Sequence, residues 1–138
     1  MARYAVDASV VLARLLYENY VLVNQFWSDI GPSDEIIGAQ MLLPECTSVL
    51  RESTFASRIT PDEAHEALRD LISLPIITSV KLEQFTRALE LAERFGKAKA
   101  YDMQYLAIAE LEAIPLVTID GGLRQSAIEL RHPVRFLR

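Results

Sequence analysis

Short apolar runs alternate along the chain with longer stretches in which apolar residues recur at helical spacing. The runs predict strands, and the stretches between them predict helices. The predicted strands cover residues 4–6, 36–37, 75–80, 115–119 and 134–137. This alternation predicts an α/β fold in which a central, mainly parallel sheet of about five strands carries helices on both faces.

The predicted helices begin and end at recognisable signals. The helix after residue 60 has the clearest start, because Thr60 and Glu63 match a capping box and Pro61 stands in its first turn. Gly96 ends another helix. The predicted helices cover residues 10–16, 21–30, 82–95 and 101–113, and two more begin near residues 43 and 61. No linker or repeat divides the chain, so we expect a single domain over residues 1–138.

The composition supports one folded domain. Of 138 residues, 51 % are hydrophobic and 24 % are charged, which is enough apolar surface to offset chain entropy and argues against disorder. The apolar runs are far shorter than the roughly 20 residues that span a bilayer, and no secretory signal is visible. A single cysteine, Cys46, cannot form an internal disulfide, so we expect a reduced, cytoplasmic protein.

The net charge limits how this chain would bind nucleic acid. The chain has 14 Lys and Arg residues against 19 Asp and Glu residues, which gives a formal charge of −5. Loose electrostatic binding to RNA or DNA normally needs a basic surface. A nucleic-acid ligand would therefore require something that screens the acids.

Four acids lie at positions where α/β folds usually carry their functional residues. Asp7 and Asp120 each end a predicted strand, whereas Glu45 and Asp102 each open a predicted helix. Ligands of such folds collect beyond the carboxyl ends of the strands, near the point where strand order reverses. If the two strands are neighbours, the carboxylates start about 5 Å apart, which is unfavourable without a cation between them. Oxygen ligands without a His or Cys cluster suit Mg²⁺ or Mn²⁺ rather than zinc.

Each of these acids also has a purely structural interpretation. Asp is a favoured helix cap, and acids in a first turn complement the helix dipole. In a binding module without catalysis the acids are caps, and neutralising Asp7 then costs about 1 kcal/mol. In a metal site, removal of one of several crowded charges raises the metal-free stability instead.

Four segments, taken in order, resemble the PIN-domain family and, within it, the VapC toxins of prokaryotic toxin–antitoxin pairs. The segments are Tyr4-Ala5-Val6-Asp7-Ala8-Ser9, Leu43-Pro44-Glu45, Ala100-Tyr101-Asp102 followed by Tyr105-Leu106-Ala107-Ile108-Ala109-Glu110, and Leu116-Val117-Thr118-Ile119-Asp120. The resemblance covers essentially the whole chain. It implies a Rossmann-like sheet in which the first and fourth strands are adjacent.

The resemblance also implies a function. PIN domains of this kind are endoribonucleases that hydrolyse RNA phosphodiester bonds with Mg²⁺ or Mn²⁺, and the VapC likeness implies a homodimer with a VapB-like antitoxin partner. Two divalent ions would change the formal charge from −5 to −1. The matching positions are the catalytic and metal-holding quartet Asp7, Glu45, Asp102 and Asp120, with one or two ions, and the supporting hydroxyl residues Ser9 and Thr118.

The basic residues depart from the family pattern. The family often has basic residues after the last acid, whereas this chain has two glycines and then Arg124. Before the third acid the family often has Ser or Thr, whereas this chain has Lys97 and Lys99. These three cations are the candidates for contact with RNA phosphates. The alternative for the two lysines is a solvated linker.

Other functions compete with a toxin. A housekeeping PIN nuclease in RNA processing fits the same residues, although a small domain without an RNA-binding appendage favours the toxin. A phosphoacceptor receiver domain needs an acidic pair after the first strand and an Asp after the third, and neither is present. A phosphatase with an aspartyl intermediate needs an Asp where Ser9 stands.

Overall fold

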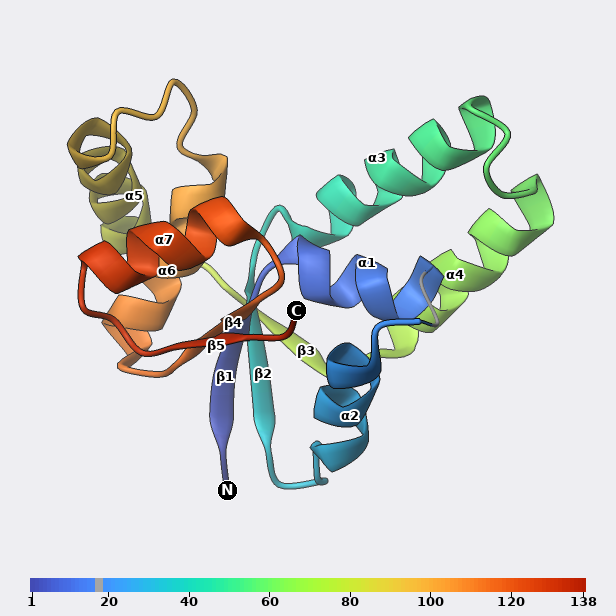
Figure 1. The fold of residues 1–138 in the computed structure, drawn as a ribbon, viewed down its shortest axis with the longest axis horizontal. Coiled ribbons are helices and arrows are strands. Elements are labelled where there is room, and N and C mark those ends of the chain that lie inside the picture. Colours follow the sequence, from blue (N-terminus) through green and yellow to red (C-terminus); the bar gives the residue numbers. More distant parts are fainter. Residues whose placement is uncertain (17–18) are drawn as a thin grey trace.

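A computed structural model describes residues 1–16 and 19–138 and places five strands and seven helices among them (Figure 1). The strands are β1 (Arg3–Val6), β2 (Glu35–Ala39), β3 (Ile76–Ser79), β4 (Leu116–Thr118) and β5 (Val134–Phe136). The helices are α1 (Ala8–Leu16), α2 (Val21–Asp29), α3 (Leu42–Phe55), α4 (Pro61–Ser73), α5 (Leu82–Arg94), α6 (Tyr101–Glu112) and α7 (Gly121–Glu129).

The strands form one sheet in the order β3-β2-β1-β4-β5, and every neighbouring pair is parallel. Helices α1 to α4 lie on one side of the sheet and α5 to α7 on the other (Figure 1). The predicted α/β fold with a parallel sheet is therefore confirmed. Strand order reverses between β1 and β4, which is where ligands bind in folds of this type.

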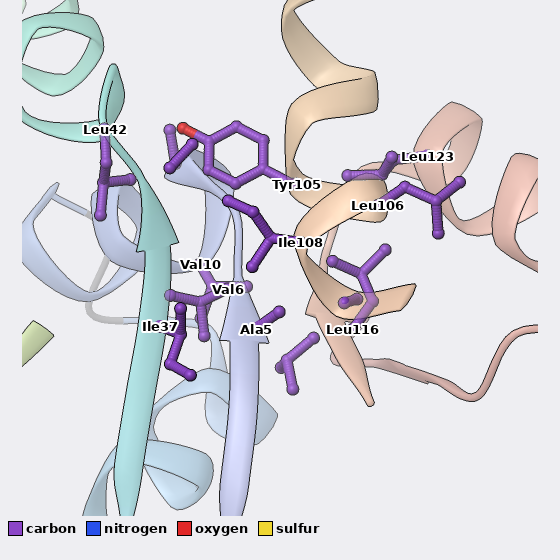
Figure 2. Packing of buried hydrophobic residues seen from close by; sticks show 14 of the residues in the cluster. Ala5, Val6, Val10, Ile37, Leu42, Tyr105, Leu106, Ile108, Leu116 and Leu123 are labelled. Carbon is purple, nitrogen blue, oxygen red and sulfur yellow. The ribbon is translucent and has the colours of Figure 1, made fainter. Parts of the chain in front are cut away.

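The core surrounds the two central strands. Val6 of β1 and Leu116 of β4 are fully buried. Figure 2 shows Ile108 of α6 packed beside β1 and Leu106 of the same helix next to Leu123. The run from Tyr105 to Ala109 is buried along its whole length, because α6 is apolar nearly all round and lies in the interior. The sequence pattern had predicted that this helix is central.

One helix is missing from the sequence prediction. Gly121 and Gly122 follow Asp120 and indicate a break, yet α7 begins at Gly121. Asp120 caps this helix by accepting a hydrogen bond from the Leu123 amide at 2.9 Å. Leu123 and Ala127 are buried one turn apart and hold the helix against the core. The cap and this inner face outweigh the low helix propensity of two glycines.

The other predicted elements are present, with small differences at their ends. The capping box is formed, because the Thr60 hydroxyl accepts from the Glu63 amide and the Glu63 carboxylate accepts from the Thr60 amide. Cys46 is fully buried and behaves as a small apolar residue. No helix in the described part of the chain has the length and apolar character needed to cross a membrane.

Gly38 marks a close approach between β2 and α3. A Cβ atom added there would lie 2.8 Å from Leu42 Cδ2 and 3.4 Å from Ile76 Cγ2. Leu42 is fully buried and cannot move aside freely, so we expect Gly38→Ala to lower the free energy of unfolding by about 1–3 kcal/mol. Urea unfolding measures this change.

Gly121→Ala is the matched control for Gly38→Ala. No atom lies within 4 Å of a Cβ added at Gly121, which stands in the first turn of a helix. We expect this variant to be neutral or up to about 1 kcal/mol more stable. Equal stability of the two variants would contradict the tight packing of Gly38 on α3.

Candidate functional site

Asp7 lies at the carboxyl end of β1 and directly before α1, and it is almost fully buried, with 6 % of its surface exposed. Its two carboxylate oxygens accept hydrogen bonds from different elements. Ser9 Oγ donates to Oδ1 at 2.6 Å, and Thr118 Oγ1, from the end of β4, donates to Oδ2 at 3.1 Å. The two hydroxyl residues therefore hold the Asp7 carboxylate across the junction of β1 and β4.

The surroundings of Asp7 disfavour its charged form. Burial raises the pKa of Asp7 to about 7, although the hydroxyls of Ser9 and Thr118 act in the opposite direction. The negative charge of Asp120 raises the pKa further. No basic side chain forms a salt bridge with Asp7 in the described part of the chain. A cation bound from solution would therefore stabilise the ionised form of Asp7.

Asp120 has two structural contacts and one free oxygen. Its amide donates to Thr118 Oγ1 at 2.9 Å, and its Oδ1 caps α7. The structural interpretation of this acid is therefore correct as far as one oxygen is concerned. Its Oδ2 accepts no hydrogen bond from the described residues, and the side chain is exposed. The cap therefore holds the carboxylate at the junction of β1 and β4 and leaves Oδ2 available to a ligand.

Glu45 stands in the first turn of α3 and is half-buried. Its carboxylate is contacted by Tyr105 of α6, whose hydroxyl lies 3.4 Å from Glu45 Oε1. Figure 2 shows the Tyr105 ring reaching from α6 toward the start of α3, where Leu42 is labelled. Sequence reasoning placed Tyr105 only in a buried apolar helix. The one available signal was a hydroxyl group within an otherwise apolar run.

Asp102 lines a small pocket together with both candidate lysines. The pocket has a volume of about 190 Å³, and its lining includes Lys97, Lys99 and Asp120. Partial burial raises the pKa of Asp102, the charge of Asp120 raises it too, and Lys97 lowers it. The two lysines thus lie beside two of the four acids, as a phosphate contact would require.

Arg124 is placed differently from the lysines. It lies on the exposed face of α7, and its guanidinium carbon is 4.7 Å from the centre of the Phe136 ring. It does not line the pocket that holds Lys97 and Lys99. Its contact with RNA stays a prediction.

The four acids are linked by repulsion. Asp120 raises the pKa of both Asp7 and Asp102, and Asp102 raises the pKa of Glu45 after the larger effect of burial. Salt bridges in the described residues involve other acids, namely Glu35, Glu90, Glu110 and Glu112. The quartet is therefore a group of carboxylates that repel one another, and among the described residues none of them forms a salt bridge, although Lys97 acts on Asp102 from a distance.

The donor set fits a hard divalent cation. Carboxylate and hydroxyl oxygens surround the site, and such ligands suit Mg²⁺ or Mn²⁺. Within residues 1–16 and 19–138, no three Asp, Glu, His or Cys side chains converge tightly enough to form a metal site as they are placed. Carboxylates repel one another without a cation between them, and a bound cation would offset that repulsion.

Comparisons with known proteins agree with this fold. A family model described as PIN domain matches residues 4–129. A comparison with curated proteins gives no significant match. Among solved structures, the chain is similar to VapC20 of Mycobacterium tuberculosis, described as a toxin that cleaves the sarcin–ricin loop, with a TM-score of 0.68, 17 % identity, and coverage of 91 % of this chain and 95 % of that one.

Two further solved structures share the fold. The chain is similar to a chain of VapBC-1 from nontypeable Haemophilus influenzae, with a TM-score of 0.68, 11 % identity and 98 % coverage of each chain. It is also similar to a chain of VapBC2 from Rickettsia felis, bound to a DNA fragment from its promoter, with a TM-score of 0.70, 12 % identity and 99 % coverage of each chain. At these identities the similarity shows a common fold.

Proposed function

The chain belongs to the PIN-domain family, and from this premise we propose that it is a Mg²⁺- or Mn²⁺-dependent endoribonuclease that acts as the toxin of a toxin–antitoxin pair. One observation carries the proposal. Burial and the charges of Asp120 and Asp102 raise the pKa values of Asp7, Asp102 and Glu45, and no salt bridge among the described residues involves these four acids, which lie where strand order reverses. Structural caps alone give no reason for that grouping.

In this proposal Asp7, Glu45, Asp102 and Asp120 hold one or two ions. When bound, a divalent ion supplies positive charge that stabilises the negative charge developing on a phosphate under attack by water. Ser9 and Thr118 orient the Asp7 carboxylate through the hydrogen bonds described above. Burial around Asp7 excludes water from that side of the site and strengthens its electrostatic interactions.

Lys97 and Lys99 are the proposed phosphate contacts. Both are exposed and line the pocket that also contains Asp102 and Asp120. Phosphate contacts of this kind position a nucleic acid without reading its sequence. They also supply local positive charge in a protein whose net charge is −5.

We further propose a VapB-like antitoxin partner, a homodimer and a cytoplasmic location. Structures of toxin–antitoxin complexes are among those with the same fold, which supports the antitoxin. Large apolar side chains on α2, α3 and α4 are exposed, including Val21, Phe55 and Ile72, and exposed apolar surface is typical of protein interfaces. Light scattering tests the dimer, which requires twice the chain mass of 15.5 kDa.

Cleavage of end-labelled total tRNA and of a long synthetic RNA tests the proposed activity. Purified protein is incubated with Mg²⁺, with Mn²⁺ or with EDTA, beside Asp102→Asn. We expect discrete, metal-dependent cuts that the variant does not make. Cuts that persist in EDTA would contradict the proposal. Absence of Mn²⁺ binding by calorimetry, together with absence of cleavage, would contradict it as well.

Tyr105 is expected to act as a positioning residue for Glu45. Tyr105→Phe removes the hydroxyl that contacts Glu45 and keeps the buried ring. Loss of such an outer contact typically weakens metal affinity by about 10- to 100-fold. We therefore expect Mn²⁺ affinity, measured by calorimetry, to fall about tenfold.

Tyr4→Phe is the control for Tyr105→Phe, because the Tyr4 ring packs edge to face with Phe26 of α2, at 5.4 Å between ring centres, and Tyr4 contacts none of the four acids in the described part of the chain. We expect Tyr4→Phe to keep the Mn²⁺ affinity of the parent protein. A Tyr105→Phe variant with unchanged Mn²⁺ affinity and a lower free energy of unfolding would show that the hydroxyl is only structural.

A further inference from the structure

A second pocket lies beside the acidic site, beyond the carboxyl ends of β2 and β3. It has a volume of about 470 Å³, within the range of about 300–1,000 Å³ for small-ligand sites. Ala39 and Ser79 form its base at the two strand ends. The side chains that give it chemical character are Gln40, Phe85, Tyr101 and Gln104.

The lining of this pocket is aromatic, amide-bearing and without charge. Tyr101 is 63 % exposed and Phe85 is 45 % exposed, so both rings offer surface to a ligand. No described residue forms a hydrogen bond with the side-chain amide of Gln40 or Gln104. No Asp, Glu, Lys, Arg or His is among the lining residues. Free amides beside exposed rings are the groups that bind a nucleobase, on its edge and on its face.

One wall of the pocket is fixed in advance. Gln84 is buried, and its Oε1 accepts hydrogen bonds from Ser79 Oγ and from the Lys81 amide, both at 2.8 Å. This amide ties the end of β3 to the start of α5. The ring of Phe85, the next residue, is therefore carried on a rigid helix start, which lowers the entropic cost of binding.

Two residues that line this pocket directly precede acids of the candidate site. Tyr101 lines it, and the next residue, Asp102, lines the lysine-bearing pocket; Pro44 lines it, and the next residue is Glu45. Two acids of the site thus directly follow residues that line the uncharged aromatic pocket, and the two lysines line the pocket that contains Asp102 and Asp120. A nucleotide has the same division, since its base is uncharged and its phosphate is anionic.

We propose that this pocket binds one base of a single-stranded RNA, next to the phosphate that is cleaved. Tyr101 and Phe85 pack against the face of the base, and Gln40 and Gln104 form hydrogen bonds with its edge. The pocket then determines which base is accepted at one position beside the cut. This inference rests on the proposed ribonuclease function, but base binding itself requires no cleavage.

Binding of the four nucleoside 5′-monophosphates tests the site without cleavage. The mononucleotides are added at millimolar concentration to isotope-labelled protein, and amide chemical shifts are followed by NMR. We expect shifts at the side-chain amides of Gln40 and Gln104 and at the backbone of Tyr101. Tyr101→Ala should weaken binding about tenfold, because stacking on an aromatic side chain typically contributes that much or more per base.

Two variants serve as controls in the binding experiment. Phe55→Ala removes an aromatic ring that is 79 % exposed at the end of α3, and we expect it to leave mononucleotide affinity unchanged. Asp70→Asn should also leave base binding unchanged, because Asp70 is an exposed acid on α4 that does not line this pocket. Chemical-shift changes that map elsewhere, or an equal affinity of Tyr101→Ala and the parent protein, would overturn the proposal.

Cleavage of RNA oligonucleotides that differ at one base beside the cut separates this inference from the proposed function. We expect Gln104→Ala to reduce the preference among bases at one position about tenfold and Tyr101→Ala to raise KM more than it lowers kcat. Cleavage with an unaltered base preference in both variants overturns the pocket and keeps the nuclease. Mononucleotide binding that depends on Tyr101 in a protein without nuclease activity supports the pocket and overturns the nuclease. Chemical-shift changes of the pocket residues that appear with an antitoxin but not with mononucleotides would show that the pocket takes an antitoxin side chain. That outcome also overturns the base-binding proposal.

Discussion

Asp7→Asn is expected to reduce metal-dependent RNA cleavage by roughly 1,000-fold or more, and to leave the metal-free protein at least as stable as the parent. A metal ion at a phosphoryl centre supplies several kcal/mol of transition-state stabilisation, and about 1.4 kcal/mol corresponds to a tenfold change in rate. Asp7 is the most buried of the four acids and is held by Ser9 and Thr118, so its carboxylate has the most defined position.

The expected stability of metal-free Asp7→Asn follows from the electrostatics around Asp7. Burial and the charge of Asp120 both disfavour an ionised Asp7, and asparagine removes that charge. Asparagine keeps the side-chain shape and one acceptor oxygen. The Ser9 and Thr118 hydroxyls can rotate to meet the new amide group. Because asparagine caps a helix as well as aspartate does, a role as helix cap alone predicts an unchanged free energy of unfolding and unchanged cleavage.

Asp70→Asn is the matched control for Asp7→Asn. Asp70 is an exposed acid on α4, outside the quartet, so its neutralisation should leave cleavage unchanged and alter stability by less than about 0.5 kcal/mol. Cleavage retained by Asp7→Asn would remove this residue from the metal site. Cleavage lost together with a clear fall in metal-free stability would show that the variant is merely misfolded.

The sequence was sufficient to predict the sheet and the location of the acids. Buried parallel strands appear as short apolar runs, and an acid directly after such a run must lie at the carboxyl edge of the sheet. Asp7 and Asp120 follow from this rule as soon as β1 and β4 are adjacent, as the strand order shows. Glu45 and Asp102 were more difficult, because an acid in the first turn of a helix has an equally good structural role.

The contacts that depend on tertiary packing were not predictable. Tyr105 of α6 contacts Glu45 of α3 although they are 60 residues apart in sequence, and only the tertiary fold brings them together. Likewise, Lys97 and Lys99 line the acidic pocket whereas Arg124 lies on Phe136, although all three are cations near an acid in sequence. Spacing along the chain does not encode which way a loop or helix face turns.

The pH dependence of the metal-free protein gives the second large effect. The pKa of Asp7 is raised from 3.8 to about 7, so between these values the folded chain holds a proton that the unfolded chain has lost. By linkage, the free energy of unfolding must fall as pH rises through this range, by up to about 4 kcal/mol in total, and then level off. Glu45 and Asp102 also have raised pKa values and add to the fall.

Other acids make the free energy of unfolding rise with pH, but they do so at lower pH. Hydrogen bonds lower the pKa values of Asp34 and Glu112, so their contribution to stability is complete above about pH 4.5 and is lost on further acidification. Urea unfolding in EDTA should therefore show maximum stability near pH 4.5 and a fall toward pH 7. Asp7→Asn should remove most of this fall, whereas Asp70→Asn should keep it.

Mn²⁺ should reverse the fall in stability, because it binds the carboxylates in their ionised form. At a free concentration of 100 times its dissociation constant it adds about 2.7 kcal/mol. The gain should be largest above pH 7 and small near pH 5, where protons compete for Asp7. A gain that does not depend on pH, or that is equal in Asp7→Asn, would mean that the ion binds elsewhere. The burial of Asp7 would then serve packing rather than catalysis.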